Sequence, residues 1–229
     1  DIDTFTRDYF ANNDPKLKAA LDSVMNDLRD AKEYGSILTV APVDFAALYA
    51  RMDEVQNDIS LYRESALNAI LPLIRVAKVL AQQYDVVVTN PPYRAVSDCS
   101  DKLNDFVKLH YPNSKNDLST VFMEKTLDLC CYHGIMAMIN IPVWMSKSSF
   151  ENLRHEILTK HTFVNMLHCG RGIFGSDFGT TSFVIWNNHI DAYYTVFHQL
   201  FDEMGAVDSV QQKEQWFFER KNGYYIQQK

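Results

Sequence analysis

The chain is poor in glycine, proline and cysteine, and it has no long apolar run. Its 229 residues include only 8 glycines and 7 prolines, which excludes a collagen-like or low-complexity chain. A content of 47% hydrophobic and 22% charged residues is typical of a protein with a packed core. The longest apolar stretches, 70–74 and 134–145, are shorter than the roughly 18 residues of a membrane-spanning helix. We therefore expect no membrane partner.

The cysteines and histidines do not form a recognisable framework. Cys99, Cys130, Cys131 and Cys169 are too few and too irregularly spaced for a set of disulfides, so reduced thiols are expected. Cys130 and His133 have a metal-ligand spacing but no second pair of ligands, and we predict no metal site. The N-terminal residues lack the basic and apolar regions of a signal peptide. Together these features predict a cytoplasmic protein.

The charge is unevenly distributed along the chain. The net charge is −7, and residues 1–60 contribute 6 basic and 12 acidic side chains. Residues 61–150 carry 9 basic and 8 acidic side chains, and residues 151–229 carry 7 and 9. Non-specific binding to nucleic acid depends on Lys and Arg that neutralise phosphates. Any contact with nucleic acid must therefore be local or involve other parts of a larger protein.

Local signals predict a helical segment followed by an α/β region. Asp14 and Pro15 are typical of a helix start, and residues 1–83 are expected to be a mostly helical lead-in. From Tyr84 on, strands alternate with helices until residue 169 and then follow one another directly, which predicts a layered α/β fold with an antiparallel edge. The expected helices of the lead-in are Pro15–Lys32, Val43–Val55 and Leu61–Gln83, the last interrupted or kinked at Pro72.

In the α/β region, the run Asp85–Thr89 has no polar alternation, so we expect a strand buried on both faces of a parallel sheet. Two capping boxes, Ser114 with Asp117 and Ser148 with Glu151, predict helix starts, and these roles explain Ser148 and Asp117 better than nucleophile or base. The other expected elements are helices over 102–110, 114–134, 148–160 and 209–220, and strands over 134–142, 163–169, 181–186 and 193–200.

The most informative motif is Asn90-Pro91-Pro92-Tyr93, directly after the Val-rich strand. Consecutive prolines stiffen the backbone and leave its carbonyls unpaired by neighbouring amides. Open α/β sheets bind ligands at the carboxyl ends of their strands. Rigid oxygen acceptors beside an aromatic ring suit a planar ligand with an exocyclic amino group. The alternative is a plain Pro-Pro turn with Tyr93 as a lid on the core, and the strand before the motif favours the functional interpretation.

The segment 85–93 resembles motif IV of amino-group methyltransferases that use S-adenosylmethionine. Further segments resemble the adenine-specific (N6) DNA methyltransferases of the BREX PglX and large type II restriction-modification family. They are 111–118, 122–124, 144–145, 148–158, 170–174 and 180–183. The resemblance implies the C-terminal half of a Rossmann-like methyltransferase sheet, with residues 84–229 running from motif IV to the end of the catalytic core.

The resemblance also implies the reaction, which is methyl transfer from S-adenosylmethionine to N6 of an adenine flipped out of double-stranded DNA. Asn90, Pro91, Pro92 and Tyr93 are the implied catalytic residues. Asn90 and Tyr93 would bind the substrate base, and Asn90 is also the candidate contact to the cofactor. The implied setting is phage defence or restriction-modification.

Two parts of the family's catalytic protein have no counterpart in this sequence. Upstream of Asn90 the chain has a single glycine, Gly35, so a glycine-rich cofactor loop is absent, and so is the target-recognition region. The chain also begins with Asp. We therefore expect an internal piece of a longer methyltransferase that is inactive alone and does not bind S-adenosylmethionine. The 85–89 strand should then have an unpaired edge, because the strand that flanks it in the family is absent.

Several features leave alternatives open. Gly170–Gly175 matches a dinucleotide fingerprint, but a polar segment follows instead of a helix, so a flexible loop over the site is the better interpretation. Basic side chains after the motif could contact phosphates or form a solvated helix face; they are Arg94, Lys102, Lys108 and Lys115. The alternatives to a DNA enzyme are a methyltransferase for protein glutamine or RNA, and a non-catalytic scaffold or DNA-contact fragment.

Overall fold

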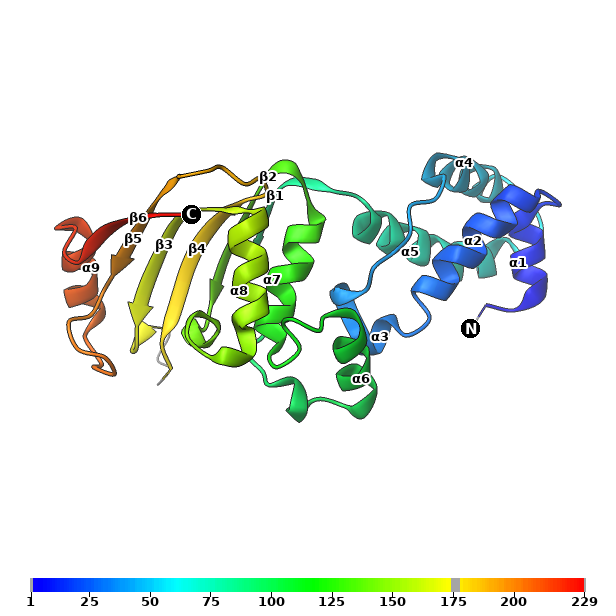
Figure 1. Cartoon of the computed structure of the whole chain (residues 1–229). Helices are drawn as coiled ribbons and strands as arrows, with labels where there is room; N and C mark the ends of the chain where they lie inside the picture. Colours follow the sequence, from blue (N-terminus) through cyan, green and yellow to red (C-terminus); the bar gives the residue numbers. More distant parts are fainter. Residues whose placement is uncertain (1, 174–177, 229) are drawn as a thin grey trace. The chain divides into compact units, whose positions relative to one another are not determined.

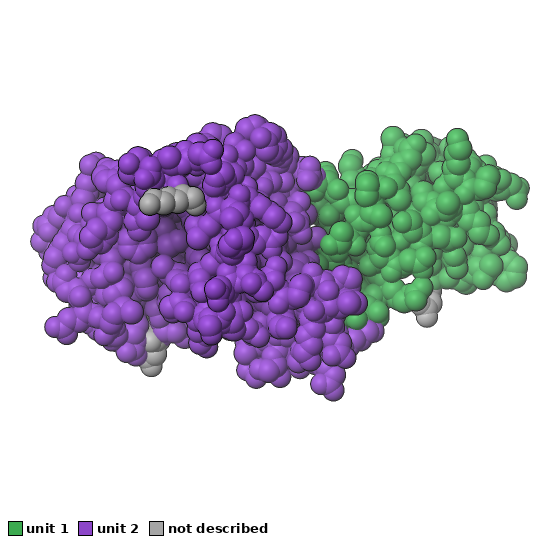
Figure 2. Space-filling view, viewed as in Figure 1, with its two compact units in different colours: residues 1–82 green, residues 83–229 purple. Residues whose placement is uncertain are grey.

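A computed structural model describes residues 2–173 and 178–228 of the chain. The chain divides into two compact units, residues Asp1–Gln82 and residues Gln83–Lys229, which Figure 2 distinguishes by colour. The described residues of the first unit form helices and turns, and the second unit contains a six-stranded sheet with its helices.

The helices of the first unit begin at local signals in the sequence. The carboxylate of Asp14 accepts hydrogen bonds from the backbone amides of Lys16 and Leu17, and Pro15 occupies the first helical position, where no amide partner is required. The elements are α1 (Thr4–Ala11), α2 (Pro15–Asp27), α3 (Ala31–Tyr34), the 3-10 turn η1 (Gly35–Ile37), α4 (Phe45–Gln56) and α5 (Arg63–Ala81).

Three details of this unit differ from the sequence prediction. No helix is predicted before Pro15, yet α1 forms, with Asp3 accepting a hydrogen bond from the amide of Thr6. α2 ends at Asp27 instead of Lys32. The helix is not interrupted at Pro72, because α5 includes this residue, and the alternative of a kink there stays a prediction. A proline removes one hydrogen bond from the helix, and the burial of four apolar side chains on α5 offsets that loss; they are Ala66, Ile70, Ile74 and Ala77.

The second unit alternates strands and helices before it ends in consecutive strands. Its elements are β1 (Tyr84–Thr89), η2 (Val96–Asp98), α6 (Asp101–His110), α7 (Leu118–Leu129), β2 (Cys130–Asn140), η3 (Pro142–Met145), η4 (Ser148–Phe150), α8 (Glu151–Lys160), β3 (Thr162–Gly170), β4 (Thr180–Trp186), β5 (Tyr194–Gln199), α9 (Val210–Phe218) and β6 (Gly223–Gln227).

The strands form one mixed sheet in the order β1-β2-β4-β3-β5-β6 (Figure 1). β1 is parallel to β2, and β3 is parallel to β5. β4 is antiparallel to both β2 and β3, and β6 is antiparallel to β5. It follows that β1, β2, β3 and β5 run in one direction and that their carboxyl ends meet at one edge of the sheet. The predicted α/β fold with antiparallel strands toward its C-terminal side is confirmed.

Both predicted capping boxes are wrong. The N-cap of α7 is Asp117, whose side chain accepts from the amide of Ser119, whereas the buried Ser114 lies in the preceding turn and its carbonyl accepts from the hydroxyl of Thr120. α8 continues from η4 and has Phe150 at its N-cap without a side-chain hydrogen bond, so Ser148 does not cap it. In each case a turn before the helix displaces the expected cap.

Two strand assignments also differ from the prediction. α7 ends at Leu129 and β2 begins at Cys130, earlier than the predicted helix end at Gly134. His133 takes a positive φ of 66°, and a Cβ on Gly134 would lie 3.0 Å from the carbonyl oxygen of Tyr84, so glycine permits the close pairing with β1. β6 is not predicted by the sequence, because all of its residues are exposed and no apolar alternation marks it.

The two faces of the sheet differ. α7 and α8 lie over the same face (Figure 1), and their side chains share a core with inward residues of β2, β3 and β4. On the other face, Val86 and Val88 of β1 are 56% and 72% exposed. The prediction that 85–89 is buried on both faces is therefore wrong, because α7 covers only the face that carries Val87. As expected, β1 lies at an edge of the sheet.

Candidate active site

The candidate site lies at the edge where the four parallel strands end. Asn90 follows β1, residues 141–146 follow β2, His168 is near the end of β3, and Gln199 is the last residue of β5. Carboxyl ends of strands in open α/β sheets are the usual position of ligand sites. The topology thus brings together segments that are more than a hundred residues apart in the sequence.

A cavity of about 670 Å³ opens among these segments. Its walls combine apolar and aromatic side chains with a few polar groups, as small-molecule sites do. The lining residues are Tyr93, Asp117, Ile141, Pro142, Val143, Met145, Ser146, His168, Phe178, Gly179, Phe197, Gln199, Phe201 and Met204. Of the four motif residues, Tyr93 is the one that lines this cavity.

The motif folds so that its first and last side chains meet. The hydroxyl of Tyr93 donates a hydrogen bond to Oδ1 of Asn90 at 2.6 Å and lies 3.3 Å from the carbonyl oxygen of Ile139. Asn90 and Pro92 are exposed, and Pro91 is buried. The stiff Pro-Pro segment therefore leaves Asn90 exposed after β1 and turns Tyr93 back toward the end of β2.

The Tyr93 ring packs against another aromatic side chain, and its partial burial keeps its hydroxyl protonated. Its ring lies edge-on to Phe178, with centroids 5.9 Å apart. Burial raises the pKa of Tyr93, and the nearby Cys169 adds to the shift. The hydroxyl is therefore a hydrogen-bond donor at neutral pH.

A short bridge fixes the segment after the motif. Ala95 pairs with Asp117, and the amide of Leu118 donates to the carbonyl of Arg94 at 2.9 Å. The Asp117 carboxylate accepts from both the amide and the hydroxyl of Ser119. Asp117 is thus the N-cap of α7 and not the third residue of a capping box, and it also lines the cavity, which the sequence does not predict.

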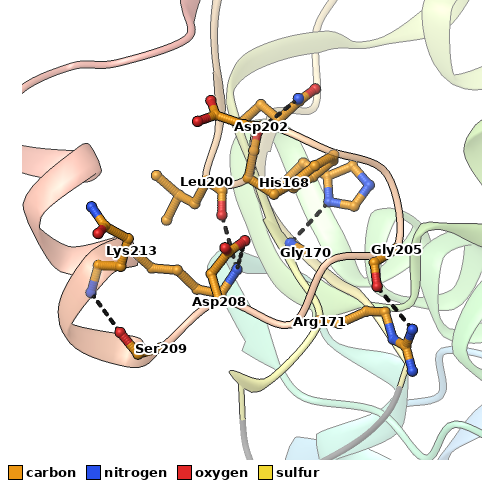
Figure 3. A network of polar contacts seen from close by, with 12 residues as sticks. His168, Gly170, Arg171, Leu200, Asp202, Gly205, Asp208, Ser209 and Lys213 are labelled. Atoms are coloured by element: carbon orange, nitrogen blue, oxygen red, sulfur yellow. Dashed lines mark hydrogen bonds and ion pairs between the residues drawn. The ribbon is translucent and has the colours of Figure 1, made fainter.

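The end of β3 carries a network that sequence reasoning missed (Figure 3). Nδ1 of His168 accepts a hydrogen bond from the amide of Gly170 at 3.2 Å, and the ring contacts Phe201 edge-on at 4.8 Å. Lys213 is only 2% exposed; its ammonium donates to the carbonyl of Leu200 at 2.9 Å and lies 3.7 Å from Oδ2 of Asp208. Burial lowers the pKa of His168, and the charge of Lys213 lowers it further.

The position of His168 at the end of a predicted strand was a signal that could have identified it. Gln199 likewise lies at the end of β5, but the sequence does not show that β5 pairs with β3, so it does not place Gln199 near the site. Lys213 lies on α9, and its spacing from the strands gives no hint that it is buried behind Gly170. Phe178 and Phe201 lie in connecting segments without periodicity, so their place in the cavity follows only from the structure.

The other candidates lie outside the cavity. Arg94 donates to the carbonyl of Asp98, and Lys108 pairs with Asp105 at 3.7 Å on the surface of α6. Burial raises the pKa of Cys130 to about 11, which makes it a poor thiolate ligand. Among residues 2–173 and 178–228, no three His, Cys, Asp or Glu side chains cluster as metal ligands would.

Two further sequence predictions concern a loop near the site and membrane-spanning segments. Residues 174 and 175 of the predicted loop Gly170–Gly175 lie outside the described residues, so that loop stays a prediction. No helix in the described part of the chain has the length and apolar character needed to span a membrane.

Comparison with known proteins agrees with the resemblance noted in the sequence. The chain is 37% identical over 202 residues to the adenine-specific methyltransferase BrxX of Escherichia coli O9:H4 (strain HS), covering 84% of this chain and 17% of that protein. It is 39% identical over 149 residues to the adenine-specific methyltransferase PglX of Lacticaseibacillus casei (strain Zhang), covering 63% of this chain and 12% of PglX.

Among solved structures, the methyltransferase subunit of a type I restriction-modification system from Streptococcus thermophilus is 12% identical, with a TM-score of 0.42. The match covers 61% of this chain and 32% of that subunit. The chain spans less than a fifth of the length of the two curated relatives. A model of the Eco57I restriction-modification methylases matches residues 16–174, which is more than half of the chain. The chain belongs to the Eco57I restriction-modification methylase family.

Proposed function

We propose that the chain forms the target-base site of a DNA adenine-N6 methyltransferase that uses S-adenosylmethionine and serves restriction-modification or phage defence. The observation that carries this proposal is the placement of Asn90-Pro91-Pro92-Tyr93 at the carboxyl end of β1, with Tyr93 in the wall of a cavity. The partners in this proposal are double-stranded DNA and the rest of the parent methyltransferase. Membership of a methylase family supports the reaction type.

The chemical problem is the weak nucleophilicity of the adenine amino group, whose lone pair is delocalised into the ring. The side-chain oxygen of Asn90 and the carbonyl of Pro91 would each accept one amino hydrogen. These acceptors favour the pyramidal nitrogen, on which positive charge develops, over the planar ground state. An amide oxygen has two lone pairs, and the Tyr93 hydroxyl uses one of them, which leaves the other for the base.

Tyr93 would hold the base by stacking. An adenine inside a duplex cannot reach the motif, so it must leave the helix and enter the cavity, where the ring face of Tyr93 replaces its stacking neighbours. The cavity of about 670 Å³ has room for a purine. No strong base is required before the transfer, because the methylated ammonium product is acidic and loses its proton afterwards.

In this proposal the cofactor is held mainly by other parts of the parent methyltransferase. Gly35 is the only glycine of residues 1–89, so the sequence before Asn90 has no glycine-rich loop whose backbone could come close to a ligand. A nucleoside cofactor requires such an approach. The share of the reaction that this chain performs is to hold and orient the amino group.

The role of Asn90 can be tested in an active methyltransferase preparation that contains this chain. We expect Asn90→Ala to lower single-turnover methylation of DNA by about 100-fold or more, because it removes an acceptor that acts mainly in the transition state. Asn57→Ala, at the exposed C-cap of α4, is the matched control and should methylate normally. Normal methylation by Asn90→Ala with unchanged melting would refute the proposed role.

A non-catalytic DNA-contact fragment is the second candidate, and the missing glycine-rich loop is the observation that favours it. The two candidates differ in what Asn90 does. A scaffold needs Asn90 only for its local fold. Asn90→Ala would then change DNA binding or stability, and methylation by the correctly folded and DNA-bound protein would be normal.

A further inference from the structure

The tautomer of His168 is fixed by its neighbours. A backbone amide can only donate, so the hydrogen bond from the amide of Gly170 makes Nδ1 of His168 an acceptor without a proton. A neutral imidazole must then carry its proton on Nε2. Figure 3 shows this second ring nitrogen directed away from Gly170, and within the described residues it has no hydrogen-bond partner.

The amide of Gly170 and the Phe201 ring both contact the His168 ring in this orientation. The Phe201 ring packs edge-on against it at 4.8 Å. Gly170 has a φ of +66°, and a Cβ there would lie 2.7 Å from Cδ1 of Phe201 and 3.2 Å from Nζ of Lys213. The glycine therefore allows Phe201, Lys213 and the His168 ring to pack around one point.

The surroundings of His168 also keep it uncharged. The ring is largely buried, and the ammonium of Lys213, held by the carbonyl of Leu200, repels a second proton. His168 lines the same cavity as Tyr93 and also a smaller neighbouring cavity of about 160 Å³. A fixed neutral donor is thus present in the wall of the proposed base site.

We propose that His168 reads the target base, with its Nε2–H donating a hydrogen bond to an unprotonated ring nitrogen of the adenine that Tyr93 stacks on. This inference rests on the proposed function and adds a selectivity element to it. Adenine has three acceptor nitrogens at positions 1, 3 and 7, whereas guanine carries a proton at position 1. Guanine shares the acceptors at positions 3 and 7, so this fixed donor distinguishes the two purines when it faces position 1.

The test uses nuclear magnetic resonance of the 229-residue chain with 15N-labelled histidine and 13C-labelled tyrosine, so that His168 and Tyr93 are both observed. Long-range proton–nitrogen spectra give the His168 tautomer directly, and titrations with adenosine, 1-deazaadenosine, 3-deazaadenosine and 7-deazaadenosine give affinities. We expect the Nε2–H tautomer at pH 7. One of the three deaza compounds should bind about three- to tenfold more weakly than adenosine, the value of one hydrogen bond.

Variants separate this contact from general packing. In His168→Leu the adenosine affinity should fall to that of the weakest deaza compound, and the difference between the two should disappear. His168→Gln keeps an N–H donor and should restore part of the difference, while the exposed His155→Leu should behave as wild type.

Failure of this inference is distinguishable from failure of the proposed function. If adenosine shifts the Tyr93 signals but all deaza compounds bind equally, or His168 is the Nδ1–H tautomer, the His168 contact is wrong and the base site stands. If adenosine shifts neither Tyr93 nor His168, the base site itself is wrong, and the inference is overturned with it.

Discussion

Replacement of Gly170 by alanine tests the packing at the end of β3. Gly170 has a φ of +66°, a conformation that costs an L-residue about 1–2 kcal/mol. A methyl group there would also lie 2.7 Å from Phe201, and overpacking of this kind typically costs about 1–3 kcal/mol. Together these effects predict that Gly170→Ala lowers the free energy of unfolding by about 2–5 kcal/mol.

Gly205 provides the matched control. Its φ is +86°, but a Cβ placed on it meets no atom within 4 Å. Gly205→Ala should therefore lose only the backbone contribution of about 1–2 kcal/mol. The difference between the two variants isolates the contact with Phe201, because both carry the same change of backbone freedom in the unfolded chain.

Tryptophan fluorescence during urea unfolding is the suitable assay. The three tryptophans, Trp144, Trp186 and Trp216, all lie in the second unit, so their signal follows the unit that contains Gly170. If Gly170→Ala and Gly205→Ala are equally destabilised, the close packing of Gly170 against Phe201 is wrong, and the fixed position of His168 loses its support.

Two further predictions follow from the edge strand and from His168. Val88 is 72% exposed on the edge strand β1. We therefore expect the wild-type chain to associate as its concentration rises and Val88→Lys to stay monomeric in sedimentation velocity. A wild-type chain that also stays monomeric would contradict this. The pKa of His168 in the folded chain lies below its ordinary value of 6.5. As the pH falls below 6.5, this histidine is protonated in the unfolded chain before it is protonated in the folded chain. The free energy of unfolding therefore decreases from near pH 6.5 down to the lowered pKa. His168→Gln should lose less stability over this range, and parallel curves of unfolding free energy against pH for the two proteins would rule the prediction out.

The sequence predicts the order of elements better than their ends or surroundings. The Val-rich run and the segment 181–186 mark β1 and β4 because apolar and β-branched residues are concentrated there. β6 is missed, since its residues are exposed and carry no periodic signal. The one-sided burial of β1 could not be predicted either, because an apolar run does not show which of its faces a helix covers.

The same limit applies to the candidate site. Asn90-Pro91-Pro92-Tyr93 is a contiguous motif after a strand, so its residues were identified before the fold was known. His168, Phe178 and Phe201 become neighbours of the motif only when β3 and β5 are placed beside β2 through β4, and no local pattern encodes that order. Lys213 is the extreme case, since a lysine on a helix is ordinarily expected at the surface.

The most direct test of the base site is a comparison of Tyr93→Phe with Tyr93→Ala in an active methyltransferase preparation that contains this chain. Single-turnover methylation and melting temperature are measured on the same samples. Stacking of a base on an aromatic ring contributes about 1–3 kcal/mol, so Tyr93→Ala should methylate roughly 5- to 150-fold more slowly. Tyr93→Phe keeps the ring face and should retain most activity, although it loses the hydrogen bond to Asn90. If Tyr93→Ala melts much earlier but its folded fraction methylates at the wild-type rate, Tyr93 is a lid on the core and the proposed base site is wrong.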